Sequence, residues 1–300
     1  QIERAAAEGR PLCLWASFHD PHPPYLVPEP WASMYDPADM QPGQLAEGEH
    51  DRNPEHFALT QRNDQAARAR WQQWHEDSHI HGAGCHKRTR EQLQQNMACY
   101  YGMMSFLDRE VGRILEALDR TGLAENTLVV YSTDHGHFLG QHGLTAKALH
   151  HYEDLLRVPF IVRWPGRAPA GQVSETLQNL VDLAPSFLAA AGQEVPGIMT
   201  GVDQTATWTG GPAARTGSIT ENRHTATNFH LRSYVNERYK ITVYRKWDVG
   251  ELFDLQEDPD EVQNLWDEPA AAALKSRMLH EFLQATLAAE PTRMPRITGA

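Results

Sequence analysis

An aspartate and a histidine stand side by side directly after a short apolar run. The run is Leu128–Ser132, and the pair is Asp134 and His135, followed by Gly136. A carboxylate and an imidazole at the end of a strand can both point at one divalent cation, and a glycine after them lets the backbone turn away. Ligand crevices of open α/β sheets lie beyond the carboxyl ends of the strands. The pair therefore predicts a metal site, with a turn aspartate and an exposed histidine as the alternative.

One lysine and several histidines follow in the same loop. Lys147 comes just before a helix predicted at His151–Leu156, where its ammonium group could hold an oxyanion beside a helix N-terminus. The alternative is a solvated surface charge. His142 and His151 are further pocket candidates. Because the chain has 16 histidines, their clustering with Asp134 is more informative than any one of them.

A Pro-rich loop carries another candidate. Pro11–Phe18 is an apolar run that predicts a buried strand, and the stretch HDPHPPY at its end contains His19 and His22. The three prolines of this stretch stiffen the loop and fix the direction of His22. We therefore expect His22 to face the same crevice as Asp134, with a plain surface turn as the alternative.

Helical and apolar stretches alternate through residues 91–191. Glu91–Arg120 has apolar residues at helical spacing, and Gly122 stands where a C-cap glycine belongs. Two apolar strands and another helix follow, at Leu128–Ser132, Phe160–Arg163 and Leu180–Ala191. The alternation predicts an α/β fold with a mostly parallel sheet flanked by helices. The polar stretch 47–90 is expected to be a long excursion over the core.

The pattern changes near Gly210. Short strand patterns joined by tight turns predict an antiparallel meander, and Ala270–Ala289 predicts an amphipathic terminal helix. We therefore expect a core domain at residues 1–210 and a smaller C-terminal subdomain, an antiparallel sheet plus a helix, at residues 211–300. The strands are expected at Ser218–Glu221, His230–Asn236, Tyr239–Lys246 and Glu251–Leu255.

Composition argues against several classes of protein. The formal net charge is −12 and the basic residues are scattered, which speaks against nucleic-acid binding. No apolar run approaches the ~20 residues that a membrane span needs. The three cysteines have no C-x-x-C spacing and predict neither a disulfide framework nor a zinc knuckle. The chain begins with Gln1 rather than Met, so we expect the numbering to start inside a longer product, and the compartment stays open.

Five stretches occur in order along about residues 10–266: SFHDPHPPY, YYGMMSFLDREVGRILEAL, TLVVYSTDHGHFLGQHG, AKALHHYEDLLRVPFIVRWPG and ELFDLQEDPDEVQNLW. Together they resemble sulfatases of the alkaline-phosphatase superfamily. Their common order makes the resemblance more specific than any single stretch. It implies an alkaline-phosphatase-like fold and a metal-dependent sulfuric ester hydrolase.

The resemblance assigns roles to residues of this chain. Asp134 matches a metal-ligand aspartate. His135 occupies the next position, which is histidine in a subgroup similar to phosphonate monoester hydrolases and choline sulfatases. Lys147 and His22 match the lysine and the histidine that contact the sulfate, and the lysine also touches the nucleophile. His151 matches a histidine that is frequent just before Tyr-Glu in similar sequences.

The same resemblance implies a metal ion and a modified nucleophile, and this chain contains only some of the residues that they require. The metal would be a divalent cation, Ca²⁺ first, with Mn²⁺ or Mg²⁺ as alternatives. The nucleophile would be a formylglycine made from the Cys or Ser of a C/S-x-P-x-R motif. No Cys or Ser in these 300 residues has Pro two and Arg four positions later, and paired aspartates and Lys-x-His are also missing. We therefore expect the nucleophile upstream of Gln1, and we expect these 300 residues alone to be inactive.

The full-length product is thus expected to cleave a small-molecule or glycan sulfate ester. Two other interpretations stay open. The first is a phosphonate monoester or phosphodiester hydrolase of the same superfamily, which His135 favours. The second is a non-catalytic sulfatase-like fragment or degenerate homologue that binds a sulfated ligand without cleaving it. Neither the particular ester nor the oligomeric state follows from the sequence.

Overall fold

Two compact units make up the chain in the computed structural model, which describes residues 1–62, 64–74, 82–147, 149–223 and 229–290. The first unit contains the described parts of Gln1–Leu45, His81–Ala148 and Pro159–Arg167. The second contains the described parts of Ala46–Ile80, Leu149–Val158 and Ala168–Ala300. Each unit is therefore assembled from stretches far apart in the sequence. The domain boundary expected between residues 210 and 211 stays a prediction.

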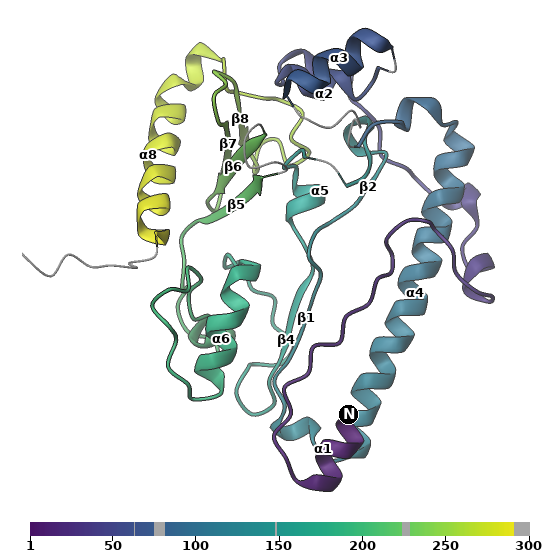
Figure 1. Ribbon diagram of the computed structural model, residues 1–300, viewed down its shortest axis with the longest axis vertical. Helices are drawn as coiled ribbons and strands as arrows, with labels where there is room; N and C mark the ends of the chain where they lie inside the picture. The colour runs from purple at the N-terminus through teal and green to yellow at the C-terminus, as the bar shows by residue number, and fades with distance from the viewer. Residues whose placement is uncertain (63, 75–81, 148, 224–228, 291–300) are drawn as a thin grey trace, which may run out of the picture. The chain divides into compact units, whose positions relative to one another are not determined.

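Helix α4, Arg90–Arg120, runs through the first unit and confirms the helix expected at residues 91–120. A capping box closes its first turn: the side chain of Thr89 accepts from the backbone N–H of Gln92, and the side chain of Gln92 accepts from that of Thr89. Gly122, with a φ of 72°, follows its last turn in the left-handed conformation. Helix α1, Ile2–Glu8, packs beside this end of α4 (Figure 1).

The strands β1, Val129–Ser132, and β4, Phe160–Arg163, pair antiparallel, with Val129 opposite Arg163. The expectation of a mostly parallel sheet is therefore wrong for this pair. A parallel connection needs a crossover of about a dozen residues or more, usually a helix. The described residues between the two strands form only short elements: β2 Phe138–Leu139, η6 Gln141–Gly143, β3 Thr145–Ala146 and α5 Glu153–Leu156.

The buried strand expected at Pro11–Phe18 is also wrong. The structure describes this stretch as irregular, and its side chains are exposed, with Leu14 at 46% and Trp15 at 78%. A strand needs a neighbour for its backbone groups, and an apolar side chain needs a layer that covers it. The described part of the first unit supplies neither to this stretch.

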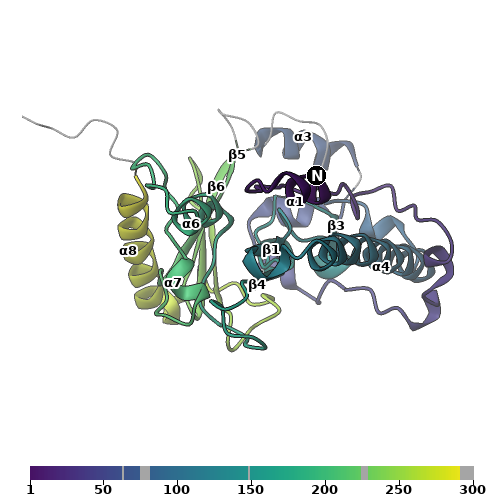
Figure 2. The ribbon, with the colours of Figure 1, turned by 90° about the horizontal axis from the view of Figure 1, so that it is seen from below.

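The antiparallel meander expected after residue 210 is confirmed in the second unit. The sheet has the strand order β5 Ser218–Arg223, β6 His230–Val235, β7 Tyr239–Tyr244 and β8 Gly250–Asp254. Helix α8, Ala272–Ala289, confirms the predicted terminal helix and lies along one face of this sheet (Figures 1 and 2). Met278 and Phe282 of α8 pack against Ile241 and Leu252 of the sheet, so the amphipathic pattern buries its apolar side there.

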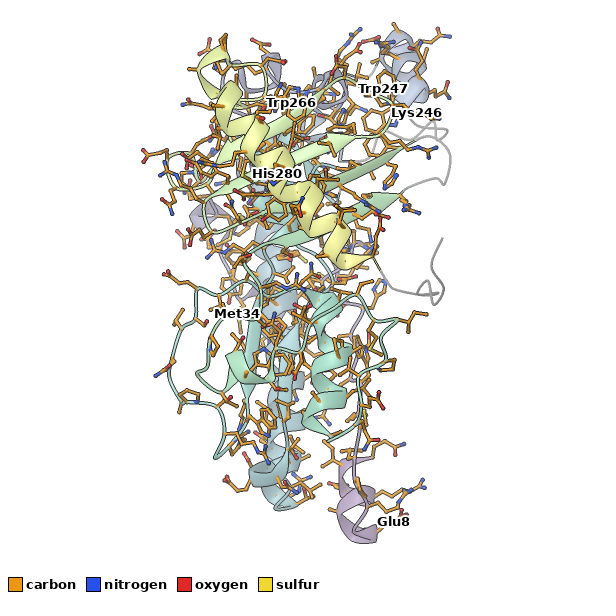
Figure 3. The ribbon with its side chains drawn as sticks, turned by 90° about the vertical axis from the view of Figure 1, so that its left-hand side faces the viewer. Glu8, Met34, Lys246, Trp247, Trp266 and His280 are labelled. Carbon is orange, nitrogen blue, oxygen red and sulfur yellow. The ribbon has the colours of Figure 1, made fainter. Side chains whose placement is uncertain are left out.

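The start of α8 is held at the edge of the sheet by Trp266. Figure 3 looks onto α8, with Trp266 beside its first turns and His280 further along the helix. The Lys275 Nζ lies 4.2 Å from the centroid of the Trp266 ring and donates to the Trp266 carbonyl at 2.7 Å. Gly250 lies against the same ring, because a Cβ at Gly250 would be 2.4 Å from one of its carbons.

Short helices account for most of the remaining regular structure. The helix expected at residues 180–191 is a 3₁₀ turn, η7 Leu180–Asp182, followed by α6 Leu183–Ala190. Across the described residues, every helix is too short or too polar to span a bilayer. The other elements are η1 Trp31–Ser33, η2 Pro37–Asp39, η3 Glu49–Asp51, α2 Glu55–Leu59, α3 Gln65–Trp74, η4 Cys85–Lys87, η5 Ala124–Asn126, α7 Thr205–Trp208 and η8 Pro269–Ala271.

Candidate active site

Asp134 and His135 follow β1 in the first unit. One carboxylate oxygen of Asp134, Oδ1, accepts from the backbone N–H of His135 at 3.0 Å and from the Thr133 hydroxyl at 3.3 Å. The other, Oδ2, lies 3.6 Å from Nε2 of His135. The Asp134 side chain is 83% exposed. The two sequence neighbours thus bring a carboxylate oxygen and an imidazole nitrogen close together, with the carboxylate open to solvent.

His135 is held in one tautomer by its own loop. Its Nδ1 lies 2.8 Å from the carbonyl oxygen of Gly136. Because a carbonyl can only accept, Nδ1 carries the proton, and Nε2 keeps its lone pair in the neutral ring. That lone pair faces the Nζ of Lys147 at 3.4 Å. Nε2 of His135 therefore accepts from the Lys147 ammonium group, and an Asp134 carboxylate oxygen lies 3.6 Å from the same nitrogen.

His22 presents its ring in the same way. Its Nδ1 lies 2.7 Å from the Pro23 carbonyl oxygen, so Nδ1 carries the proton and Nε2 keeps the lone pair of the neutral ring. The ring is exposed, and its centroid lies 4.8 Å from that of His19. His22, His135 and Lys147 all lie close enough to one further side chain, His137, to influence its pKa.

His137 is the residue that the sequence reasoning missed. Its Nε2 lies 2.5 Å from the hydroxyl of Tyr25, and its ring stacks on that of Tyr100 with centroids 5.1 Å apart. Burial first of all, and the neighbouring His135, His22 and Lys147 in addition, lower the pKa of His137 to about 4. Burial also raises the pKa of Tyr25 to about 12. In the sequence, the pattern His-Gly-His at residues 135–137 could have indicated that His137 belongs with His135.

Asp134 and His135 fit a divalent cation only in part. They offer one carboxylate oxygen and one imidazole nitrogen, both exposed enough to reach a ligand. Within the part of the chain that the structure describes, no three His, Cys, Asp or Glu side chains gather closely enough to hold a metal ion. Further ligands would have to come from elsewhere. An imidazole ligand favours a transition-metal ion, since Ca²⁺ takes oxygen ligands.

The two further pocket candidates, His142 and His151, lie outside this group of side chains. His142 is buried in η6 with a φ of 55°, and its ring meets Phe138 edge-on at 6.3 Å. His151 is buried in the second unit, where its Nδ1 lies 2.7 Å from the Ser233 hydroxyl. Burial lowers the pKa of His151 to about 3, with the charge of Lys240 adding to the effect. Their roles in a pocket stay predictions.

Several solved structures resemble most of this chain. The phosphonate monoester hydrolase of Agrobacterium radiobacter matches 96% of this chain and 59% of its own, with a TM-score of 0.76 and 25% identity. The architecture is thus the expected alkaline-phosphatase-like α/β fold with an added antiparallel sheet. The sequence model of the sulfatase family matches residues 1–193, more than half of the chain. This protein belongs to the sulfatase family.

Further matches agree with that assignment. The model of the C-terminal part of N-sulphoglucosamine sulphohydrolase matches residues 140–288. The N-acetylglucosamine-6-O-sulfatase of Bacteroides thetaiotaomicron is 32% identical over 206 residues, which are 64% of this chain and 36% of that protein. The choline-sulfatase of Rhizobium meliloti is 26% identical over 271 residues, 87% of this chain and 47% of its own. The chain spans half the length or less of these curated relatives.

Proposed function

We propose that this chain forms the second part of a sulfuric ester hydrolase. The observation that carries the proposal is the grouping at His135, whose Nε2 lies 3.6 Å from an Asp134 carboxylate oxygen and 3.4 Å from the Lys147 ammonium. A metal-type pair beside a cation suits an ester that carries a negative charge. The relation to an N-acetylglucosamine-6-O-sulfatase supports a sugar sulfate as the substrate class.

Each residue would have one task in that reaction. Asp134 and His135 would hold the cation, which when bound neutralises charge and lowers the pKa of a nearby hydroxyl group. The Lys147 ammonium and the His22 imidazole would bind sulfate oxygens, where one lost contact typically costs ~3 kcal/mol. The formylglycine nucleophile would come from outside these 300 residues. Lys147 would then stabilise the negative charge that develops as this nucleophile attacks the sulfur atom.

The test is a comparison of two lysines in the complete protein. Lys147→Ala should lower kcat/KM for an aryl sulfate by about 100-fold or more, because an oxyanion contact is lost. Lys87→Ala, at an exposed lysine of the same unit, should leave it unchanged. Asp134→Asn should weaken metal binding in calorimetry as well as activity. Equal effects of the two lysine variants would refute the role of Lys147, and robust turnover by these 300 residues alone would refute a separate source of the nucleophile.

A phosphonate monoester hydrolase is the second candidate. His135 and the likeness to the Agrobacterium radiobacter enzyme, at 25% identity, favour it. Assays of the complete protein on an aryl sulfate and on the matching phosphonate monoester separate the two. A kcat/KM that is higher for the sulfate supports the first proposal, and the opposite ratio supports the second. Turnover of neither, together with weak Mn²⁺ and Ca²⁺ binding, would indicate a non-catalytic homologue.

A further inference from the structure

One hydrogen bond joins the two loops that carry the proposed anion-binding residues. The Tyr25 hydroxyl lies 2.5 Å from Nε2 of His137. Tyr25 stands three residues after His22, and His137 stands two residues after His135. The bond spans 112 positions in the sequence. It therefore ties the irregular loop of His22 to the loop that follows β1.

Both partners of this bond rest on helix α4. The ring of Tyr100 stacks on His137 at an interplanar angle of 22° and meets Tyr25 edge-on, with centroids 6.0 Å apart. The thiol of Cys99, the preceding residue of α4, donates to the Tyr25 carbonyl at 3.3 Å. A long helix capped at both ends is a firm support, so the pair has a fixed base and a fixed spacing.

We propose that Tyr25 and His137 are positioning residues that hold His22 at the distance from His135 and Lys147 at which all three can contact one oxyanion. His22 needs such a support because its own loop has no regular structure and its ring is exposed. Displacements of about 1 Å can cost about 100-fold in rate. The identity of the anion depends on the proposed function, whereas the positioning of His22 does not.

Spectroscopy tests the positioning without any assay of turnover. In the complete protein with ¹⁵N-labelled histidines, Tyr25→Phe should shift the ring signals of His137 and of His22, although His22 makes no bond to the lost hydroxyl. Tyr35→Phe is the matched control, because it removes a hydroxyl that bonds to Ser105 of α4 at 2.7 Å. It should leave both signals in place. An unchanged His22 signal in Tyr25→Phe would overturn the proposal.

A double-mutant cycle tests the consequence for the anion. Tyr25→Phe should weaken inorganic sulfate binding and lower kcat/KM by about 10-fold, with little change in Tm, since a loosened His22 loses part of its contact. In a His22→Ala background the same change should have almost no further effect. Additive losses would mean that Tyr25 acts on the fold in general and would contradict the proposal. If wild-type protein neither binds sulfate nor cleaves its esters, the proposed function fails, and the histidine signals still decide the positioning.

Discussion

At the scale of single residues, the second unit buries an unusual set of charges next to its sheet. Lys240 of β7 is fully buried and forms ion pairs with Glu153 Oε1 at 3.1 Å and Glu261 Oε1 at 2.5 Å. Glu251 of β8 is also buried and accepts a hydrogen bond from the Tyr244 hydroxyl. Buried charges persist where they are paired, and removing one partner is costly. Glu251, which has no cation in hydrogen-bond contact among the described residues, is the group that should respond to pH.

The pKa of Glu251 sets a window for that response. Burial raises it from 4.5 to about 7, even though the hydrogen bond from Tyr244 and the charge of Lys240 act to lower it. Between these values the folded protein keeps a proton that the unfolded chain has lost, so stability should fall as pH rises. His151 acts in the opposite direction below its ordinary pKa of 6.5, because burial keeps it neutral in the fold. The two groups therefore oppose each other in mildly acidic solution.

We predict that Glu251→Gln gains stability over wild type as pH rises from 4.5 to 8, because the amide mimics the protonated acid and cannot ionise. The gain should reach on the order of 3 kcal/mol, from about 1.4 kcal/mol per pKa unit. Urea unfolding of both proteins at several pH values measures it. Glu257→Gln, at a carboxylate that is 80% exposed, serves as control and should follow wild type. Parallel pH curves for Glu251→Gln and wild type would show that Glu251 does not titrate in this window.

At the scale of elements, α4 contains two glycines in very different surroundings. A Cβ at Gly102 would lie 2.3 Å from the carbonyl oxygen of Trp31, so the backbone of the preceding segment packs directly on the helix there. A Cβ at Gly112 would meet nothing within 4 Å. Close packing therefore requires a glycine at position 102, whereas Gly112 only lowers the helix propensity of α4.

These two positions predict opposite signs for the same substitution. Gly102→Ala should lower the free energy of unfolding by about 1–3 kcal/mol, as overpacking does. Gly112→Ala should raise it by up to about 1 kcal/mol. Urea unfolding of the two variants beside wild type checks both. Destabilisation by Gly112→Ala, or an unchanged midpoint in Gly102→Ala, would mean that Trp31 does not pack on α4 as described.

At the scale of the whole molecule, the uncovered stretch Pro11–Phe18 should govern how this chain behaves in solution. Adjacent exposed apolar side chains mark a surface that associates. We predict that the 300-residue chain self-associates and that Leu14→Ser with Trp15→Ser reduces this. Val173→Ser with Ile198→Ser, two exposed but separate positions at 95% and 60%, should not. Sedimentation velocity at several concentrations measures the difference, and a monomeric wild-type chain at all of them would contradict the prediction.

Local patterns were sufficient for much of the fold. Apolar residues at helical spacing predicted α4 and α8, and Gly122 predicted the end of α4. Short strand patterns joined by tight turns predicted the sheet β5–β8. Each of these signals arises from neighbours within a few residues, because helix and hairpin contacts are local. Asp134 and His135 stood out as candidates for the same reason, as adjacent residues after a predicted strand, and their role in metal binding stays a prediction.

Contacts between distant residues had to come from the folded chain. The antiparallel direction of β1 and β4 and the exposure of Pro11–Phe18 depend on which layers lie beside them, and periodicity does not contain that information. The contacts of His137 with Tyr25 and Tyr100 join residues that lie far apart in the sequence. Residue type and spacing name the groups that can act, whereas burial and long-range neighbours decide which of them face one another.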